Sequence, residues 1–107
     1  MLAPVVIVIA RFRPRPDRRD DLVALLEDVQ AASRLDDGCL HYGYYTEIAN
    51  PLAFIAVEEW RDQEALAAHL RQSHVARLIA ALPGLGDGRV EIAAHEVAAS
   101  GPLPLPE

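Results

Sequence analysis

The chain has 107 residues, 51% of them hydrophobic, and a formal net charge of −6. This length suits a single domain with its own core. The acidic balance argues against nucleic acid as a partner, because no basic surplus is available to neutralise phosphates. The apolar stretch "LAPVVIVIA" near the N-terminus is too short to span a bilayer, so no membrane partner is expected. A lone cysteine, Cys39, excludes an internal disulfide and a cysteine-based metal site, and it suits the reducing cytoplasm, where we expect the protein to reside.

The first predicted elements are a strand and a helix. The segment "VVIVIARF" (residues 5–12) is rich in β-branched residues and almost continuously apolar, which is typical of a strand covered on both faces. A helix is predicted from Asp17, because apolar residues recur at helical spacing; these are Leu22, Leu25, Leu26 and Val29. The sequence "LDDG" stops this helix, and Gly38 suits the turn.

A hairpin and a second helical region follow. The segments "CLHYGYYTEI" (39–48) and "LAFIAVEEW" (52–60) have strand-forming compositions, and "ANP" between them predicts a tight turn. Asp62 is a candidate N-cap for the next helix. Ser73 is a point at which this helix breaks or is capped again, and Pro83 is expected to end it.

The last predicted strand is "RVEIAAHEV" (89–97), so the element order is β-α-β-β-α-β. This order predicts an α+β fold of the ferredoxin-like kind, a four-stranded antiparallel sheet with two helices on one face. We assign residues 1–98 to this domain and residues 99–107 to a flexible, proline-rich C-terminal tail. Two helices leave the other face of the sheet bare, although the first strand is apolar on both sides. A second copy packed face to face covers it, so we expect a homodimer that forms a dimeric α+β barrel.

One face of the third predicted strand combines aromatic side chains with a carboxylate. Alternation along the strand places Phe54, Ala56, Glu58 and Trp60 on the same face. On the following helix, His69 shares a stripe with apolar residues and is therefore predicted to point toward the sheet. If the Trp60 face is the one that the helices cover, Trp60, Glu58 and His69 line one cleft.

Three interpretations of His69 remain open. It is a histidine at the edge of the core with a hydrogen-bonded neighbour, a metal ligand, or a base or hydrogen-bond donor in an aromatic-lined pocket. Against a metal, His69 and His74 are five positions apart, which separates them by about 140° on a continuous helix. The other two histidines, His41 and His95, fall on different strands, so no metal site is expected.

Three further residues are candidates for contact with a substrate. Tyr42 lies on the second predicted strand and reaches a pocket if its face is the covered one. Arg11 interrupts an apolar strand, where it either projects to the rim of the cleft or forms a surface ion pair. His74 either contacts the substrate or decorates the start of a helix.

The chain resembles the antibiotic biosynthesis monooxygenase family. The resemblance rests on an ordered set of motifs: Asp37-Gly38-Cys39-Leu40-His41-Tyr42, then Glu58-Glu59-Trp60, and then Glu64-Ala65-Leu66-Ala67-Ala68-His69. It covers about residues 5–97, and the set is more specific than any of its parts.

The resemblance implies a dimeric α+β barrel with a pocket between sheet and helices in each subunit. It also implies a cofactor-independent monooxygenase that oxidises an electron-rich phenol or quinol, of polyketide or quinol type, with O2. The corresponding roles are His69 as base or hydrogen-bond partner, Glu58 as the residue that orients His69, Trp60 as a stacking wall and Tyr42 as a polar contact. Phe54, Arg11 and His74 are added as candidate substrate contacts.

Two alternatives remain open because the family is functionally mixed. One is a small-molecule-binding or stress-response dimer without catalysis. The other is haem binding or degradation, for which related proteins use an Asn on the first strand. This chain reads "VIVIARF" there and has no such Asn, which weighs against haem.

Overall fold

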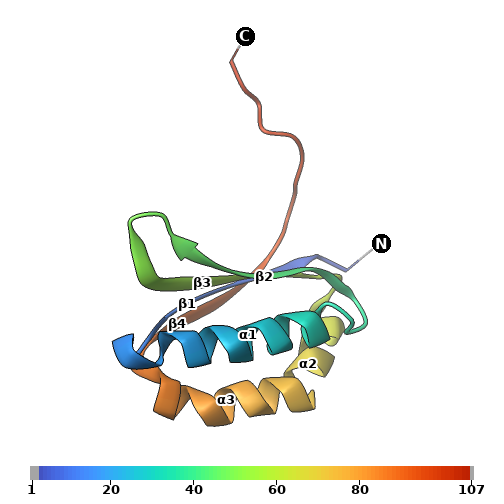
Figure 1. Ribbon diagram of the computed structural model, residues 1–107. Helices are drawn as coiled ribbons and strands as arrows, with labels where there is room; N and C mark the ends of the chain where they lie inside the picture. The colour runs from blue at the N-terminus through green and yellow to red at the C-terminus, as the bar shows by residue number, and fades with distance from the viewer. Residues whose placement is uncertain (1–2, 107) are drawn as a thin grey trace.

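The computed structural model describes residues 3–106 (Figure 1). Residues 1, 2 and 107, at the ends of the predicted domain and tail, lie outside the described part of the chain. The elements in chain order are β1 (Val6–Pro14), a short 3-10 turn η1 (Pro16–Arg18), α1 (Arg19–Ser33), β2 (Cys39–Glu47), β3 (Asn50–Trp60), α2 (Gln63–Leu70), α3 (Ser73–Leu85) and β4 (Gly86–Glu96).

The four strands form one sheet in the order β2-β3-β1-β4, and every neighbouring pair is antiparallel. All three α-helices lie on the same face of this sheet (Figure 1). The predicted ferredoxin-like α+β architecture is therefore confirmed. The core lies between the two layers, and the predicted apolar stripe of α1 is buried in it: Leu22, Leu25, Leu26 and Val29.

The covered face of β3 is the one that carries the aromatic residues and the carboxylate. Its buried members are Phe54, Ala56, Glu58 and Trp60. The register places Glu58 opposite Val8 of β1 on one side and Tyr42 of β2 on the other. Strand alternation thus turns Glu58 toward the helices near the end of β3.

The second predicted helical region is two helices, because the helical conformation is interrupted just before Ser73. Gln72 has extended backbone angles (φ −74°, ψ 149°). The N–H groups of Arg71 and Gln72 close the end of α2 on the carbonyls of Ala68 and His69. The prediction that Pro83 ends the second of these helices was wrong. Proline there forfeits a single helical hydrogen bond, and α3 continues to Leu85.

The opposite face of the sheet has no cover from the described part of the chain. Ile7 and Ile9 of β1 are only half-buried there, so β1 is covered on one face rather than two within a single copy. After β4, the N–H of Val97 still donates to the carbonyl of Val5 (2.9 Å). The proline-rich segment then extends away from the sheet on the side opposite the helices (Figure 1). Its flexibility stays a prediction. Within residues 3–106, no helix combines the length and the apolar character needed to cross a bilayer.

Candidate functional site

A cavity of about 250 Å³ lies between the sheet and helices α2 and α3. Its floor is formed by side chains of all four strands, and its roof by apolar side chains of the two helices. The wall is mostly apolar, and its polar members are four: Tyr42, Tyr44, Glu58 and His69. A mostly apolar hollow with a few polar groups is the usual form of a small-molecule site.

His69 reaches this cavity from the last turn of α2. The side chain of Asp62 caps the start of that helix by accepting from the N–H of Ala65 at 2.8 Å, as its sequence position predicts. The cap fixes where the helix begins, and helical spacing then turns Ala65, Leu66 and His69 toward the sheet. Only 3% of the His69 side chain is exposed.

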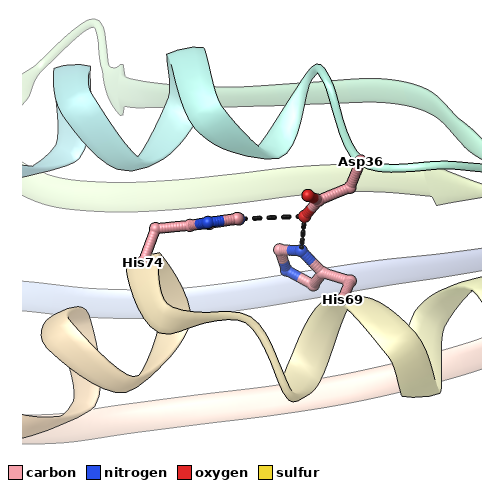
Figure 2. Close-up of side chains that lie close together, drawn as sticks. All are labelled: Asp36, His69 and His74. Atoms are coloured by element: carbon pink, nitrogen blue, oxygen red, sulfur yellow. Dashed lines mark hydrogen bonds and ion pairs between the residues drawn. The ribbon is translucent and has the colours of Figure 1, made fainter.

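Asp36 holds the imidazole of His69 in place. Its Oδ2 lies 2.8 Å from Nδ1 of His69 (Figure 2). A carboxylate only accepts hydrogen bonds, so the proton of the neutral ring sits on Nδ1. The Nε2 atom is then left with a free lone pair, and its nearest charged neighbour is Oε1 of Glu58 at 3.8 Å. This arrangement leaves Nε2 available as a proton acceptor.

The turn between α1 and β2 fixes the position of Asp36. The N–H of Asp36 donates to the carbonyl of Ser33, and its own carbonyl accepts from the N–H of Cys39, both at 3.1 Å. Two residues later Gly38 adopts φ +80°, and a Cβ at this position would collide with the side chain of Ala65. Glycine therefore allows the turn to pack directly on α2, which brings Asp36 next to His69.

His74, at the start of α3, binds the same carboxylate oxygen. Its Nε2 lies 2.9 Å from Oδ2 of Asp36 (Figure 2). Both imidazoles therefore point toward one carboxylate from different helices. The exposed fraction of the side chain rises from 3% for His69 to 12% for Asp36 and 17% for His74, so this trio leads from the interior toward solvent.

Glu58 is held by a different partner. Its Oε1 accepts a hydrogen bond from the indole Nε1 of Trp60 at 2.9 Å. The Trp60 ring is fully buried and packs on His69, with ring centroids 4.4 Å apart. Trp60 therefore contacts both polar groups, by a hydrogen bond to Glu58 and by ring packing on His69. On β2, the hydroxyls of Tyr42 and Tyr44 are hydrogen-bonded to each other at 2.7 Å at the cavity wall.

Burial sets the protonation of these groups. Desolvation lowers the pKa of His69, against the opposing hydrogen bond to Asp36. Desolvation also raises the pKa of Glu58, against the hydrogen bond from Trp60. It raises the pKa of Tyr42 to about 12 and raises that of Tyr44 as well. A neutral imidazole and two neutral phenols thus face the cavity near neutral pH.

Comparison with known proteins identifies the family. Residues 5–81 match the sequence model described as "Antibiotic biosynthesis monooxygenase". Rv0793 of Mycobacterium tuberculosis is 42% identical over 74 residues, which are 69% of this chain and 71% of that protein. The chain belongs to the antibiotic biosynthesis monooxygenase family.

Solved structures show the same fold. The structure of Rv0793 has a TM-score of 0.84 at 31% identity, covering 92% of this chain and 99% of that one. A mutant of SnoaB, a cofactor-independent oxygenase from Streptomyces nogalater, has a TM-score of 0.80 at 18% identity over 94% of this chain and 100% of that one. An uncharacterized protein of Synechocystis is 25% identical over 93 residues, 87% of this chain. The chain spans 63% of that relative's length.

Within this family member, four of the predicted substrate contacts lie outside the cavity. Trp60 does not line it; the fully buried indole contacts His69 and Glu58, which do. Phe54 lies toward the other end of the sheet under Arg19, whose guanidinium sits 5.4 Å from the ring centroid. Arg11 is exposed on the opposite face of the sheet, and His74 faces Asp36. Alternation along β1 alone excludes Arg11, since Val8 and Phe12 occupy the covered face.

Asp36, rather than Glu58, makes the short contact to His69: its Oδ2 lies 2.8 Å from Nδ1, whereas Oε1 of Glu58 lies 3.8 Å from Nε2, so the orienting role of Glu58 stays a prediction. Asp36 was missed because "LDDG" was interpreted only as a helix stop. Its role depends on how the turn packs on α2, which no local pattern reveals. Alternation along β2 puts Tyr44 on the same strand face as Tyr42, and Tyr44 lines the cavity although only Tyr42 was chosen as a candidate contact.

The premise used against a metal site was wrong too. His69 and His74 are not on one continuous helix, so the angle between positions five apart does not apply. Asp36, His69 and His74 each offer one donor atom, and these atoms lie within 4.8 Å of one another. The break expected at Ser73 was the signal that the two histidines are able to converge.

Proposed function

We propose that this protein is a cofactor-independent monooxygenase that oxidises a small electron-rich phenol or quinol with O2. One observation carries the proposal: His69 lines a mostly apolar cavity, and because Asp36 binds its Nδ1, its Nε2 is left to accept a proton. Family membership supports it. Further support comes from the names of two relatives, since SnoaB is called a cofactor-independent oxygenase and Rv0793 is called a proposed monooxygenase.

The chemistry begins with a proton. His69 Nε2 takes the proton of a phenolic hydroxyl, and the phenolate that forms is electron-rich enough to give an electron to O2. One oxygen atom then bonds to a ring carbon, which loses its hydrogen, and the other oxygen leaves as water. A hydroquinone thereby becomes a hydroxyquinone, and all the electrons that reduce O2 come from the substrate. No external reductant is required.

The residues around His69 have separate tasks in this proposal. Asp36 keeps the ring in the tautomer that can accept at Nε2 and stabilises the imidazolium after proton uptake. Glu58, 3.8 Å from Nε2, faces the N–H that the uptake creates. The paired hydroxyls of Tyr42 and Tyr44 offer a donor to a second oxygen of the substrate. The apolar wall excludes water and so protects the oxygen intermediate from premature release.

The cavity volume selects the size of the substrate. A dry cavity of roughly 150 Å³ holds benzene, so about 250 Å³ corresponds to one ring or two fused rings. Its rim carries apolar side chains that are more than half exposed, namely Leu70, Ile79 and Ile92. We therefore expect benzene and naphthalene hydroquinones, including alkylated ones, to react faster than the three-ring anthrones.

A homodimer in the reducing cytoplasm is part of the proposal. The half-buried Ile7 and Ile9, together with Ile55 and Val57 of β3, form an apolar strip on the uncovered sheet face. Packing this strip against a second copy removes it from water. Placing a charge there with Ile9→Asp should yield a folded monomer in sedimentation analysis. A wild-type protein that sediments as a monomer contradicts the dimer. The cytoplasmic setting is supported by the single free Cys39.

Oxygen uptake tests the proposal. The protein is mixed with naphthalene and benzene hydroquinones and with anthrones, and O2 consumption above the buffer rate is followed with an electrode. The wild type should consume O2, and His69→Ala should lose about 100-fold or more, which is the usual contribution of a general base. Arg71→Ala is the control, since Arg71 is exposed just after α2 and lies outside the cavity lining. No uptake by the wild type, with hydroquinones nevertheless raising its melting temperature, would favour a non-catalytic binding protein.

A further inference from the structure

We propose that Asp36, His69 and His74 form a binding site for a divalent transition-metal ion, with zinc as the expected occupant. The three donor atoms are Oδ2 of Asp36, Nδ1 of His69 and Nε2 of His74, and all lie within 4.8 Å of one another. They come from the α1–β2 turn, the end of α2 and the start of α3, and their side chains point into one common space (Figure 2). Two imidazoles and a carboxylate are ligands that zinc accepts readily.

The geometry requires only small movements. Zinc bonds to nitrogen and oxygen are about 2.0–2.2 Å long, so two ligands in a tetrahedral site stand roughly 3.4 Å apart. The carboxylate oxygen now lies 2.8 Å from one nitrogen and 2.9 Å from the other. To hold an ion, each O–N separation has to lengthen by about half an ångström, and the two nitrogens, which lie within 4.8 Å of each other, have to settle near the same roughly 3.4 Å. In the metal-free protein the two hydrogen bonds keep the ligands gathered.

A carboxylate stands close to the outer nitrogen that a metal-bound His69 would present, and a small shift brings it to hydrogen-bond distance. When an ion occupies Nδ1, the ring proton moves to Nε2. That atom faces Oε1 of Glu58 at 3.8 Å, and Glu58 is itself fixed by the indole N–H of Trp60. A carboxylate that accepts the outer N–H of a ligating histidine is the common support of zinc sites. The structure thus offers a partner for the histidine in both of its tautomers.

The site also has an entry path and an open position. His74 is the most exposed of the three side chains, so an ion approaches from its side without crossing the cavity. Three protein ligands leave the fourth tetrahedral position to water. This differs from a closed structural site, which uses four protein ligands.

Metal binding and proton acceptance exclude each other at His69, a consequence that rests on the proposed function. With zinc on Nδ1, Nε2 carries the proton and no longer has a free lone pair toward the cavity. The ion is therefore an inhibitor rather than a cofactor. Zinc should slow hydroquinone oxidation, and a chelator should restore the original rate.

The metal proposal is tested by direct binding, independently of turnover. The full chain is freed of metal with a chelator and titrated with zinc in a calorimeter, and with cobalt(II), whose visible absorption reports coordination. Wild type should bind a single ion per chain. Glu58→Gln should weaken binding about 10–100-fold, the usual effect of removing a supporting carboxylate. His74→Ala should weaken it by at least as much, whereas His95→Ala should leave it unchanged.

Histidine ring NMR decides the question if a variant fails to fold. Zinc added to the wild type should shift the ring nitrogens of His69 and His74 and leave those of His41 and His95 in place. Absence of saturable binding, or binding that moves His41 or His95 instead, overturns the metal site. If zinc binds as expected but the protein consumes no O2 with any hydroquinone, the proposed function fails while the metal site stands.

Inhibition is measured for each protein against its own metal-free rate. Zinc should slow wild type at the concentrations that saturate the calorimetric site, and His74→Ala should need at least about tenfold more zinc for the same fractional loss. Unchanged rates at saturating zinc would refute the inhibitory role, because a metal-bound His69 would still accept protons.

Discussion

Replacing Asp36 by Asn should damage the protein far more than the same change at its neighbour Asp37. One oxygen of Asp36 accepts hydrogen bonds from two largely buried imidazoles, at 2.8 and 2.9 Å. Asp37 is 91% exposed at its side chain, and within residues 3–106 its one ion-pair partner is Arg61, at 3.4 Å. The two positions are adjacent in the chain, so they form a matched pair.

The magnitude follows from the two contacts. A hydrogen bond to a charged group contributes about 1.5–3 kcal/mol and a neutral one about 0.5–1.5 kcal/mol. An Asn oxygen in the same place keeps both bonds but loses the charge, at about 1 kcal/mol each, so unfolding becomes easier by about 2 kcal/mol. For a domain of this size that lowers the melting temperature by roughly 8–16 °C. A surface pair contributes about 0–1 kcal/mol, so Asp37→Asn should change little.

The turnover number kcat should also fall more in Asp36→Asn than in Asp37→Asn. Only the bond to His69 acts on the imidazolium that forms during proton uptake, so about 1–1.5 kcal/mol is lost from the transition state, which is roughly tenfold in kcat. Asp36→Ala removes the acceptor altogether and also frees the ring to turn. The loss in kcat should then approach the effect of His69→Ala, about 100-fold or more.

Urea unfolding followed by fluorescence measures the stability change, because the single tryptophan, Trp60, packs on His69 and reports the state of this region. Steady-state O2 uptake gives kcat. Equal behaviour of Asp36→Asn and Asp37→Asn would refute the reasoning. So would a gain in stability at Asp36, because it would mean that burying the carboxylate costs more than its two bonds return.

Three further changes probe the surroundings of the site. Trp60→Phe keeps an aromatic ring but removes the donor to Glu58, so urea unfolding followed by circular dichroism should show a loss of about 1–3 kcal/mol; an unchanged midpoint would mean that this bond contributes nothing. Ala56→Leu places its added carbons in the cavity, so KM for hydroquinones should rise at least tenfold. The variant should keep its stability, because the loss of about 1–3 kcal/mol that overpacking causes applies to a filled core. An unchanged KM would show that the substrate binds elsewhere. Asp62→Ala removes the cap of α2 and should lower the melting temperature at pH 7. Because the N–H of Ala65 lowers the pKa of Asp62, the cap stabilises the fold above the ordinary aspartate pKa, and its contribution is lost as pH falls through the lowered value; a gap between wild type and variant that persists in strong acid would contradict this.

Much of the architecture was predictable because its causes are local. The alternation along residues 52–60 gives the covered face of β3, and the apolar stripe of α1 gives the layer that covers it. Asp62 was recognisable as a cap from its place before a helical pattern, and Gly38 from its place after one. Each of these inferences depends on neighbours within a few residues, where sequence patterns are informative.

The arrangement of the candidate site depends on contacts between distant segments, and sequence patterns do not specify those. Asp36 and His69 are 33 residues apart, and Asp36 and His74 are 38 apart. These three side chains come together only because the α1–β2 turn packs on α2 and the helix is interrupted at Gln72. Trp60 was predicted to contact substrate because it shares a strand face with Glu58, but position on a face does not reveal which residue stands in front. Whether a side chain on that face reaches the cavity depends on how its neighbours pack around it.

The most direct test of the central claim is the fate of labelled oxygen. Wild-type protein, a naphthalene hydroquinone and ¹⁸O₂ are incubated together, and the product is analysed by mass spectrometry. A base at a mostly apolar cavity next to a bound quinol predicts a hydroxyquinone that carries one labelled atom from O2 and none from water, with its yield lost in His69→Ala. A product labelled from water, or a yield that does not change when His69 is removed, would contradict the account.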